Sequence, residues 1–127
     1  MTLRRQAVRF GCGGAVNTAV GLACIFAAMA LGADEVTANM AGYGVGLGLS
    51  FTLNRRWTFE SDGRAGMQLL RFLAAFVIAY CTNLGSVLLL RDVVGVNAYI
   101  AQACGVVPYT IVFFLLSRYF VFAEGMR

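Results

Sequence analysis

Residues 51–59 read FTLNRRWTF, and residues 114–122 read FLLSRYFVF. Both stretches have a phenylalanine, then Asn or Ser three positions later, then an arginine, with aromatic residues two and four positions after that arginine. Each stretch follows a long apolar segment, so the second half of the chain repeats the ending of the first. Because a helix of roughly 20 apolar residues spans a bilayer, the repeat predicts two homologous helical hairpins in a membrane.

The composition of the 127-residue chain is that of a membrane protein. Hydrophobic residues make up 60% and charged residues 13%, and the mean hydropathy is +0.76. A soluble domain of this length buries too little surface to hide so many apolar side chains. We predict one all-α membrane domain over residues 1–127, with four spanning helices. They cover about residues 10–31, 36–54, 68–90 and 96–117.

The basic residues, all ten of them arginines, predict the orientation. Nine precede the first apolar segment, lie around the polar middle loop or follow the last segment, and only Arg91 lies elsewhere. The positive-inside rule therefore places both termini and the middle loop in the cytoplasm. The two hairpins then run in the same direction, as a parallel repeat. Arginines at helix ends favour anionic lipid headgroups as partners, and not nucleic acid.

Two arginines are the first candidates for a binding site. Arg55 and Arg118 occupy equivalent positions in the repeat, at the ends of the second and fourth segments. Guanidinium groups bind phosphate with two parallel hydrogen bonds. The pair either anchors the helices at the interface or clamps a lipid phosphate. Arg9 and Arg71, each followed by phenylalanine, are candidates to complete the basic cluster.

Polar and small residues within the segments form the second group of candidates. A buried amide that faces lipid tails costs a few kcal/mol, so we expect amides to point inward and bond across helices. They are either contacts between helices or a path for sugar hydroxyls. The amide residues are Asn17, Asn39, Asn54, Asn83 and Gln102. In the second segment, small residues recur at every fourth position, which favours close helix packing or a thin wall beside a lipid-accessible groove. They include Gly42, Gly46 and Ser50.

Several residue types are missing where chemistry would need them. The middle of each apolar segment lacks Asp, Glu, His and Lys, which disfavours a proton-coupled drug exporter. Without histidine, neither a Ser-His-Asp nor a Cys-His site exists. The four cysteines lie in apolar segments without a CxxC spacing, and we expect them to be buried and reduced. We expect no catalytic residue, no metal site and no cofactor, and we predict that the chain is not an enzyme.

The order and spacing of these motifs resemble the GtrA-like family of small four-span membrane proteins, and the membrane domain of some dolichol-phosphate mannose synthases. The resemblance covers nearly the whole chain. Its second closing stretch has Ser117 where the first has Asn54, so the two need not be equivalent in function. The residues that carry it are Arg9-Phe10, Gly14, Asn17, Ala38-Asn39, Gly42-Tyr43, Gly46, the stretch 51–59, Arg71-Phe72, Asn83, Gln102 and the stretch 114–122.

The resemblance implies a multi-pass protein of the bacterial cytoplasmic membrane that serves cell-surface polysaccharide synthesis. Its expected ligand is a sugar linked to undecaprenyl or decaprenyl phosphate, which it would bind and move across the bilayer. A homo-oligomer would supply more wall for the path than four short helices. The alternative is a scaffold that anchors a glycosyltransferase without transport, and a small drug exporter is the third hypothesis.

Overall fold

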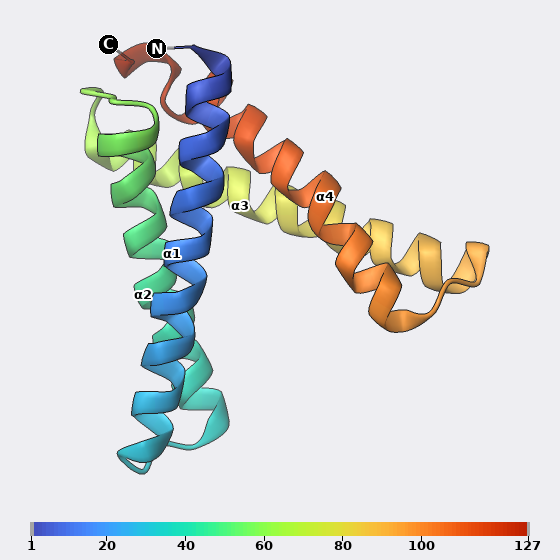
Figure 1. The fold of residues 1–127 in the computed structure, drawn as a ribbon. Coiled ribbons are helices and arrows are strands. Elements are labelled where there is room, and N and C mark those ends of the chain that lie inside the picture. Colours follow the sequence, from blue (N-terminus) through green and yellow to red (C-terminus); the bar gives the residue numbers. More distant parts are fainter. Residues whose placement is uncertain (1, 127) are drawn as a thin grey trace. The chain divides into compact units, whose positions relative to one another are not determined.

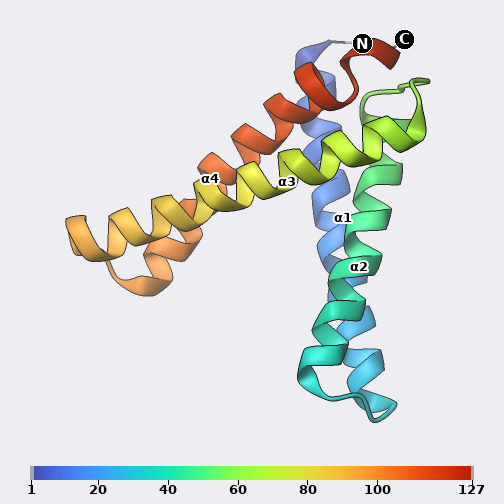
Figure 2. The ribbon, with the colours of Figure 1, turned by 180° about the vertical axis from the view of Figure 1, so that it is seen from behind.

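The structure, a computed structural model, describes residues 2–126, which form helices joined by short connections. The chain is divided into two compact units, one extending to Asp62 and the other comprising Gly63–Met126. Each unit is a helical hairpin (Figures 1 and 2). The boundary falls in the polar middle segment of the sequence.

The first hairpin consists of α1 (Leu3–Ala30), α2 (Glu35–Leu53) and a π-helical turn, η1 (Asn54–Thr58). Its two helices run antiparallel and side by side in both views (Figures 1 and 2). α1 begins seven residues before the predicted span, because the side chain of Thr2 accepts a hydrogen bond from the amide of Arg5 (3.2 Å) and caps the helix.

The second hairpin repeats this arrangement. It consists of α3 (Ala65–Leu88), the π-helical segment η2 (Leu89–Val94), α4 (Ala98–Leu116), the π-helical turn η3 (Ser117–Val121) and a short 3-10 turn, η4 (Ala123–Gly125). Neither η1 nor η3 was expected from the sequence, and both occupy the repeated arginine-bearing stretch.

The turns at the closed ends of the hairpins use equivalent residues. Gly32 and Gly95 adopt positive φ angles of 101° and 84°, which glycine reaches without strain. Asp34 caps α2 by accepting from the amide of Thr37 (3.3 Å), and Asn97 caps α4 by accepting from the amide two positions later (2.8 Å). The hydroxyl of Thr37 also donates to Asp34, and these two bonds lower the pKa of the Asp34 carboxyl.

Small residues let the two helices of each hairpin approach closely. A Cβ atom at Gly42 would collide with Ile25 and lie 3.0 Å from the carbonyl oxygen of Gly21. A Cβ atom at Gly105, the equivalent position in α4, would lie 2.7 Å from Cγ2 of Val87. The small-residue face of α2 is therefore in contact with α1.

The chain is an all-helical membrane protein, as expected, and residues 2–126 contain four α-helices. Within the described residues, three continuous helical stretches are long and apolar enough to cross a membrane, Leu3–Ala30, Ala65–Val94 and Ala98–Val121. α2 falls short of that measure, since its glycines and polar residues dilute its apolar content. Its crossing is therefore taken up below as a proposal.

The expectation that the cysteines are buried is wrong for three of the four. Cys12, Cys81 and Cys104 are exposed on their hairpins, and Cys24 is half-buried. The physical reason is that a two-helix unit has little interior. Most of its side chains point outward, where lipid or another helix covers them.

Candidate functional site

The open end of the first hairpin is held by one arginine. Nη1 of Arg9, in α1, donates to the carbonyl oxygen of Trp57 in η1 (2.7 Å). The same nitrogen lies 3.2 Å from a carboxylate oxygen of Glu60. The guanidinium carbon also lies 5.2 Å from the centre of the Trp57 ring, within the range of a cation–π interaction. Three contacts thus fix one side chain.

The open end of the second hairpin has the same arrangement. Nη1 of Arg71, in α3, donates to the carbonyl oxygen of Phe120 in η3 (3.3 Å), and its guanidinium carbon lies 5.3 Å from the Phe120 ring. The acidic partner is Glu124, whose carboxylate oxygen lies 3.9 Å from Nη1. Arg9 and Arg71 are therefore structural equivalents.

The π-helical turns explain why these arginines are needed. Each turn closes with a backbone hydrogen bond between residues five positions apart. In η1 the amide of Phe59 donates to the carbonyl of Asn54 (2.9 Å), and in η3 the amide of Phe122 donates to the carbonyl of Ser117 (3.0 Å). The last carbonyls of a helix have no partner within it, and a cation at that end complements the helix dipole. Arg9 supplies both the donor and the charge at η1.

Two further pairs belong to the repeated arrangement. The rings of Phe10 and Phe59 lie 6.4 Å apart, and those of Phe72 and Phe122 lie 6.4 Å apart. One turn before each arginine is a buried glutamine, Gln6 in α1 and Gln68 in α3. Sequence reasoning missed the glutamines, although a Gln-x-x-Arg-Phe spacing occurs in both halves and would have revealed them.

The acidic partners distinguish the two ends. Glu60 adopts a φ angle of +47°, a strained conformation for a residue other than glycine, and its side chain is 39% exposed while that of Arg9 is 16% exposed. Glu124 is 82% exposed and Arg71 is 29% exposed. Ala123 stands at the position that corresponds to Glu60 in the repeat. The ion pair is closer and less exposed in the first hairpin.

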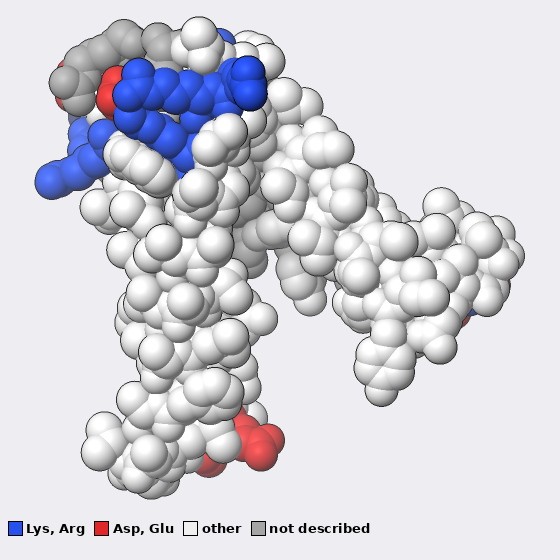
Figure 3. All heavy atoms as spheres, viewed as in Figure 1, with Lys and Arg blue, Asp and Glu red and all other residues white. Residues whose placement is uncertain are grey.

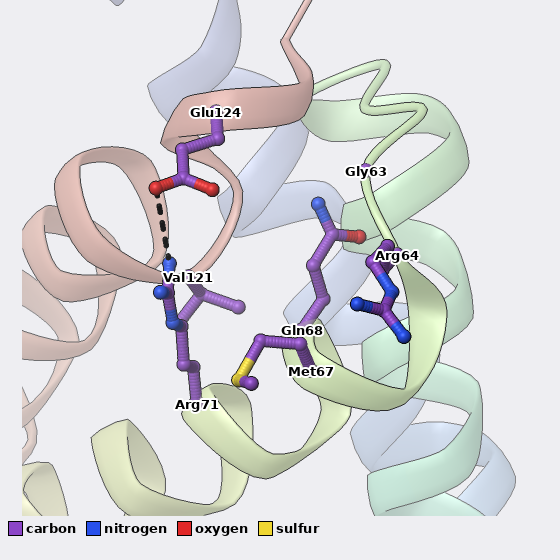
Figure 4. A pocket seen from close by; sticks show the side chains of 7 residues that line it. All are labelled: Gly63, Arg64, Met67, Gln68, Arg71, Val121 and Glu124. Atoms are coloured by element: carbon purple, nitrogen blue, oxygen red, sulfur yellow. Dashed lines mark ion pairs between the residues drawn. The ribbon is translucent and has the colours of Figure 1, made fainter.

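A cavity of about 230 Å³ opens beside Arg71 in the second hairpin. Figure 4 shows Arg64 and Arg71 on opposite sides of it, with the amide of Gln68 between them and Glu124 beyond Arg71. The cavity thus combines two cations, an amide and one carboxylate. Its lining residues are Gly63, Arg64, Met67, Gln68, Arg71, Val121 and Glu124.

The two arginines predicted to form a clamp lie within the π-helical turns. Nε and Nη1 of Arg118 are buried and have no hydrogen-bond partner among the described residues, while its guanidinium carbon lies 5.3 Å from the Tyr119 ring. Arg55 is half-buried in η1. The two arginines belong to separate hairpins, so their joint action stays a prediction.

Two of the predicted amides lie between the helices of their own hairpin. Asn17 lies beside Gly46, where a Cβ atom would be 3.4 Å from its Oδ1. Asn83 lies beside Gly105, where a Cβ atom would be 3.3 Å from its Nδ2. Asn54 is buried, and its amide nitrogen lies 3.3 Å from the hydroxyl of Ser50.

The other two amides differ from the expectation. Asn39 and Gln102 are exposed on their hairpins, and the side chain of Asn39 donates to the carbonyl of Glu35 in its own helix (3.0 Å). The prediction that Asn39 bonds across to another helix is therefore wrong for this hairpin. The first carbonyl of α2 lies one turn away, so Asn39 reaches it without a partner helix.

Charge is segregated along the first hairpin. Its open end carries Arg4, Arg5 and Arg9 from α1 and two arginines from η1, which outnumber Glu60 and Asp62 at the same end, whereas Asp34 and Glu35 lie at its closed end. Figure 3 shows arginines gathered at the open end and acidic side chains at the turn. The open end is suited to anionic ligands.

Residues 2–126 hold no group of His, Cys, Asp and Glu side chains arranged to bind a metal ion.

Comparison with known families places this geometry in context. The family described as GtrA/DPMS, transmembrane domain, matches residues 9–122. The matched range runs from Arg9, which holds the first open end, to Phe122, which closes η3. None of the curated proteins compared matches the chain.

Proposed function

The chain belongs to the GtrA/DPMS transmembrane-domain family, and on that premise we propose that it binds a polyprenyl-phosphate-linked sugar and moves it across the bacterial cytoplasmic membrane. The family consists of small membrane proteins that are implicated in cell-surface polysaccharide synthesis and are generally not catalytic. The observation that carries the proposal is Arg118, whose buried guanidinium nitrogens have no partner among the described residues.

Buried guanidinium N–H groups without an acceptor, such as those at Nε and Nη1 of Arg118, are costly. A phosphate group relieves that cost with charge-assisted hydrogen bonds. Arg118 therefore binds the lipid phosphate at the cytoplasmic interface, together with its equivalent, Arg55. Arg9 and Arg71 complete the basic cluster. Each of them also caps its own hairpin, so the phosphate competes for them with Glu60 and Glu124.

The proposed topology has four crossings, with both termini in the cytoplasm. α2 has 19 residues, a length of about 28 Å at roughly 1.5 Å per residue, close to the roughly 30 Å of the hydrocarbon core. It also packs side by side with α1 (Figures 1 and 2), a helix long and apolar enough to span. A helix that lies along a spanning partner shares its depth in the bilayer.

The sugar headgroup passes along amide side chains while the prenyl tail remains in lipid. Amides offer both donors and acceptors to sugar hydroxyls, and the glycine-rich α2 provides a thin wall. Because no Asp, Glu, His or Lys lies in the middle of a span, no residue is available to couple transport to protons. Transport therefore runs downhill, and a homo-oligomer supplies additional wall. The amides of this path are Asn17, Asn39, Asn54, Asn83 and Gln102.

Reconstitution in liposomes tests the proposal. The purified chain is inserted into vesicles that contain a radiolabelled polyprenyl-phosphate sugar, and the labelled sugar that becomes accessible on the other leaflet is measured over time. Transbilayer movement with the chain alone supports transport. If movement is no faster than in protein-free vesicles and a glycosyltransferase co-purifies, the chain is a scaffold.

A further inference from the structure

We propose that the cavity of the second hairpin is the docking site for a phosphate group, and that Glu124 occupies Arg71 until the phosphate arrives. This inference rests on the proposed function, because it locates where the phosphate first binds. It concerns one hairpin only, so it does not depend on how the two units are arranged.

The cavity has the size and the chemistry for a phosphate group. At about 230 Å³, it has the volume of about eight water molecules at roughly 30 Å³ each. Arg64 and Arg71 flank it and the amide of Gln68 lies between them (Figure 4). Guanidinium groups are donors that bind phosphate oxygens with charge-assisted hydrogen bonds, and a side-chain amide is a further donor.

The glycine at the cavity wall leaves room for the side chain of Gln68. A Cβ atom at Gly63 would collide with Nε2 of Gln68 and lie 3.1 Å from its Cδ. The backbone of the loop therefore lies directly against the amide of this buried glutamine. This contact holds Gln68 between the two arginines (Figure 4).

Glu124 is a weak and replaceable partner. Its carboxylate lies 3.9 Å from Nη1 of Arg71, its side chain is 82% exposed, and exposed ion pairs contribute little. A phosphate group between Arg64 and Arg71 can accept charge-assisted hydrogen bonds from both guanidinium groups, whereas the carboxylate of Glu124 pairs with Arg71 at long range. The phosphate therefore displaces Glu124, while Arg71 keeps its bond to the carbonyl of Phe120.

Direct binding measurements test this exchange. The full chain is placed in nanodiscs of zwitterionic lipid, and radiolabelled farnesyl phosphate, a short prenyl phosphate, is titrated. Arg71→Gln should weaken binding about tenfold and Arg64→Gln about threefold. Glu124→Gln should tighten binding about threefold, a gain that an unfolded variant could not show.

Arg91→Gln is the matched control. It removes the same charge from the same helical hairpin, 20 residues from Arg71 and therefore about 30 Å along the helix, where Arg91 pairs with Asp92. Its affinity should stay within about twofold of the wild type. Equal affinities for the wild type, Arg71→Gln and Glu124→Gln would overturn the inference.

Two competitors identify the source of the phosphate. Farnesol tests the prenyl tail alone, and inorganic phosphate tests the anion alone. Displacement by farnesol at the concentration of farnesyl phosphate overturns the inference. If inorganic phosphate competes at that concentration, the site binds free phosphate; if it competes only at much higher concentration, the site binds a lipid headgroup.

The failure of this inference is distinguishable from the failure of the proposed function. If liposomes show transport while the variants of the cavity bind farnesyl phosphate like the wild type, the inference fails and transport stands. If the variants change binding as expected but vesicles show no transbilayer movement, the cavity is a docking site and the transport proposal fails.

Discussion

The open ends of the two hairpins are built alike but paired differently. In both, an arginine from the first helix donates to a carbonyl in the π-helical turn that follows the second helix and lies over an aromatic ring. The first arginine has a close carboxylate partner in Glu60, whereas the second has the distant and exposed Glu124. The arginine contact is thus duplicated, but its ion pair is close in the first hairpin. In the second hairpin the ion pair is weak, so an anionic ligand can compete with Glu124 for Arg71.

The largest expected effect concerns the pair within the π-helical turns. Replacing both Arg55 and Arg118 with glutamine should weaken binding of a polyprenyl phosphate about a hundredfold or more, because each loses charge-assisted bonds worth about 1.5–3 kcal/mol. Between the single variants, Arg118→Gln should cost more, since its nitrogens have no partner among the described residues. Arg118→Lys, which keeps the charge but not the fork, should recover part of the loss. Unchanged binding by the double variant, with its helical circular dichroism intact, would reject the clamp.

The glycine contacts allow the packing of the two hairpins to be compared. Gly42→Ala places a methyl group against Ile25 and the backbone carbonyl of Gly21, whereas Gly105→Ala meets Val87 first. Overpacking costs about 1–3 kcal/mol, and we expect Gly42→Ala at the upper end because backbone yields less than a side chain. Thermal unfolding in detergent measures the difference. A larger loss for Gly105→Ala would show that α2 has more freedom to shift than its contacts indicate.

The arginine contacts should differ in their contribution to stability. Arg9→Gln removes a carbonyl bond of 2.7 Å and an ion pair of 3.2 Å, and should lower the free energy of unfolding by about 1–2 kcal/mol. Arg71→Gln removes longer contacts and should cost about half as much. Denaturant titration of the two variants tests this order. Equal costs would mean that Glu60 adds nothing to the first hairpin.

The smallest expected effect is a difference in pH dependence between the N-terminal caps of α2 and α4. The pKa of Asp34 is lowered by its bonds to Thr37, so this cap is fully formed above the unfolded pKa of about 3.9. It is lost as the pH falls through the lower folded value. Asn97, the equivalent cap of α4, does not titrate. Hydrogen exchange, corrected for intrinsic rates, should show that the Thr37 amide loses protection in acid while the Tyr99 amide does not. In Asp34→Asn, the acid-dependent loss should disappear.

The sequence predicted the helices well because their signals are local. Each helix lies within a few residues of an apolar segment, apart from the start of α1, where arginines continue the helix. Arginines end an apolar segment without ending a helix, because arginine itself favours helix. The α2 segment is the least apolar of the four, because its glycines allow close packing against α1 and lower its apolar content.

The candidate site was only partly predictable. Arg9 and Arg71 were identified by their position in the repeat, but their carbonyl partners lie 48 and 49 residues away. Such contacts depend on the π-helical turns, and the residues of these turns do not distinguish them from an ordinary helix end in the sequence. The cavity beside Arg71 likewise required Gly63 and Gln68 to be brought together by the fold.

The arginine contacts also restrict how each hairpin can move. A turn joins the two helices at one end, and a guanidinium joins them at the other, so each hairpin is fastened twice. Sliding one helix along its neighbour would break the hydrogen bond from Arg9 to the Trp57 carbonyl or from Arg71 to the Phe120 carbonyl. Each hairpin therefore resists sliding of its two helices and behaves as one stiff body.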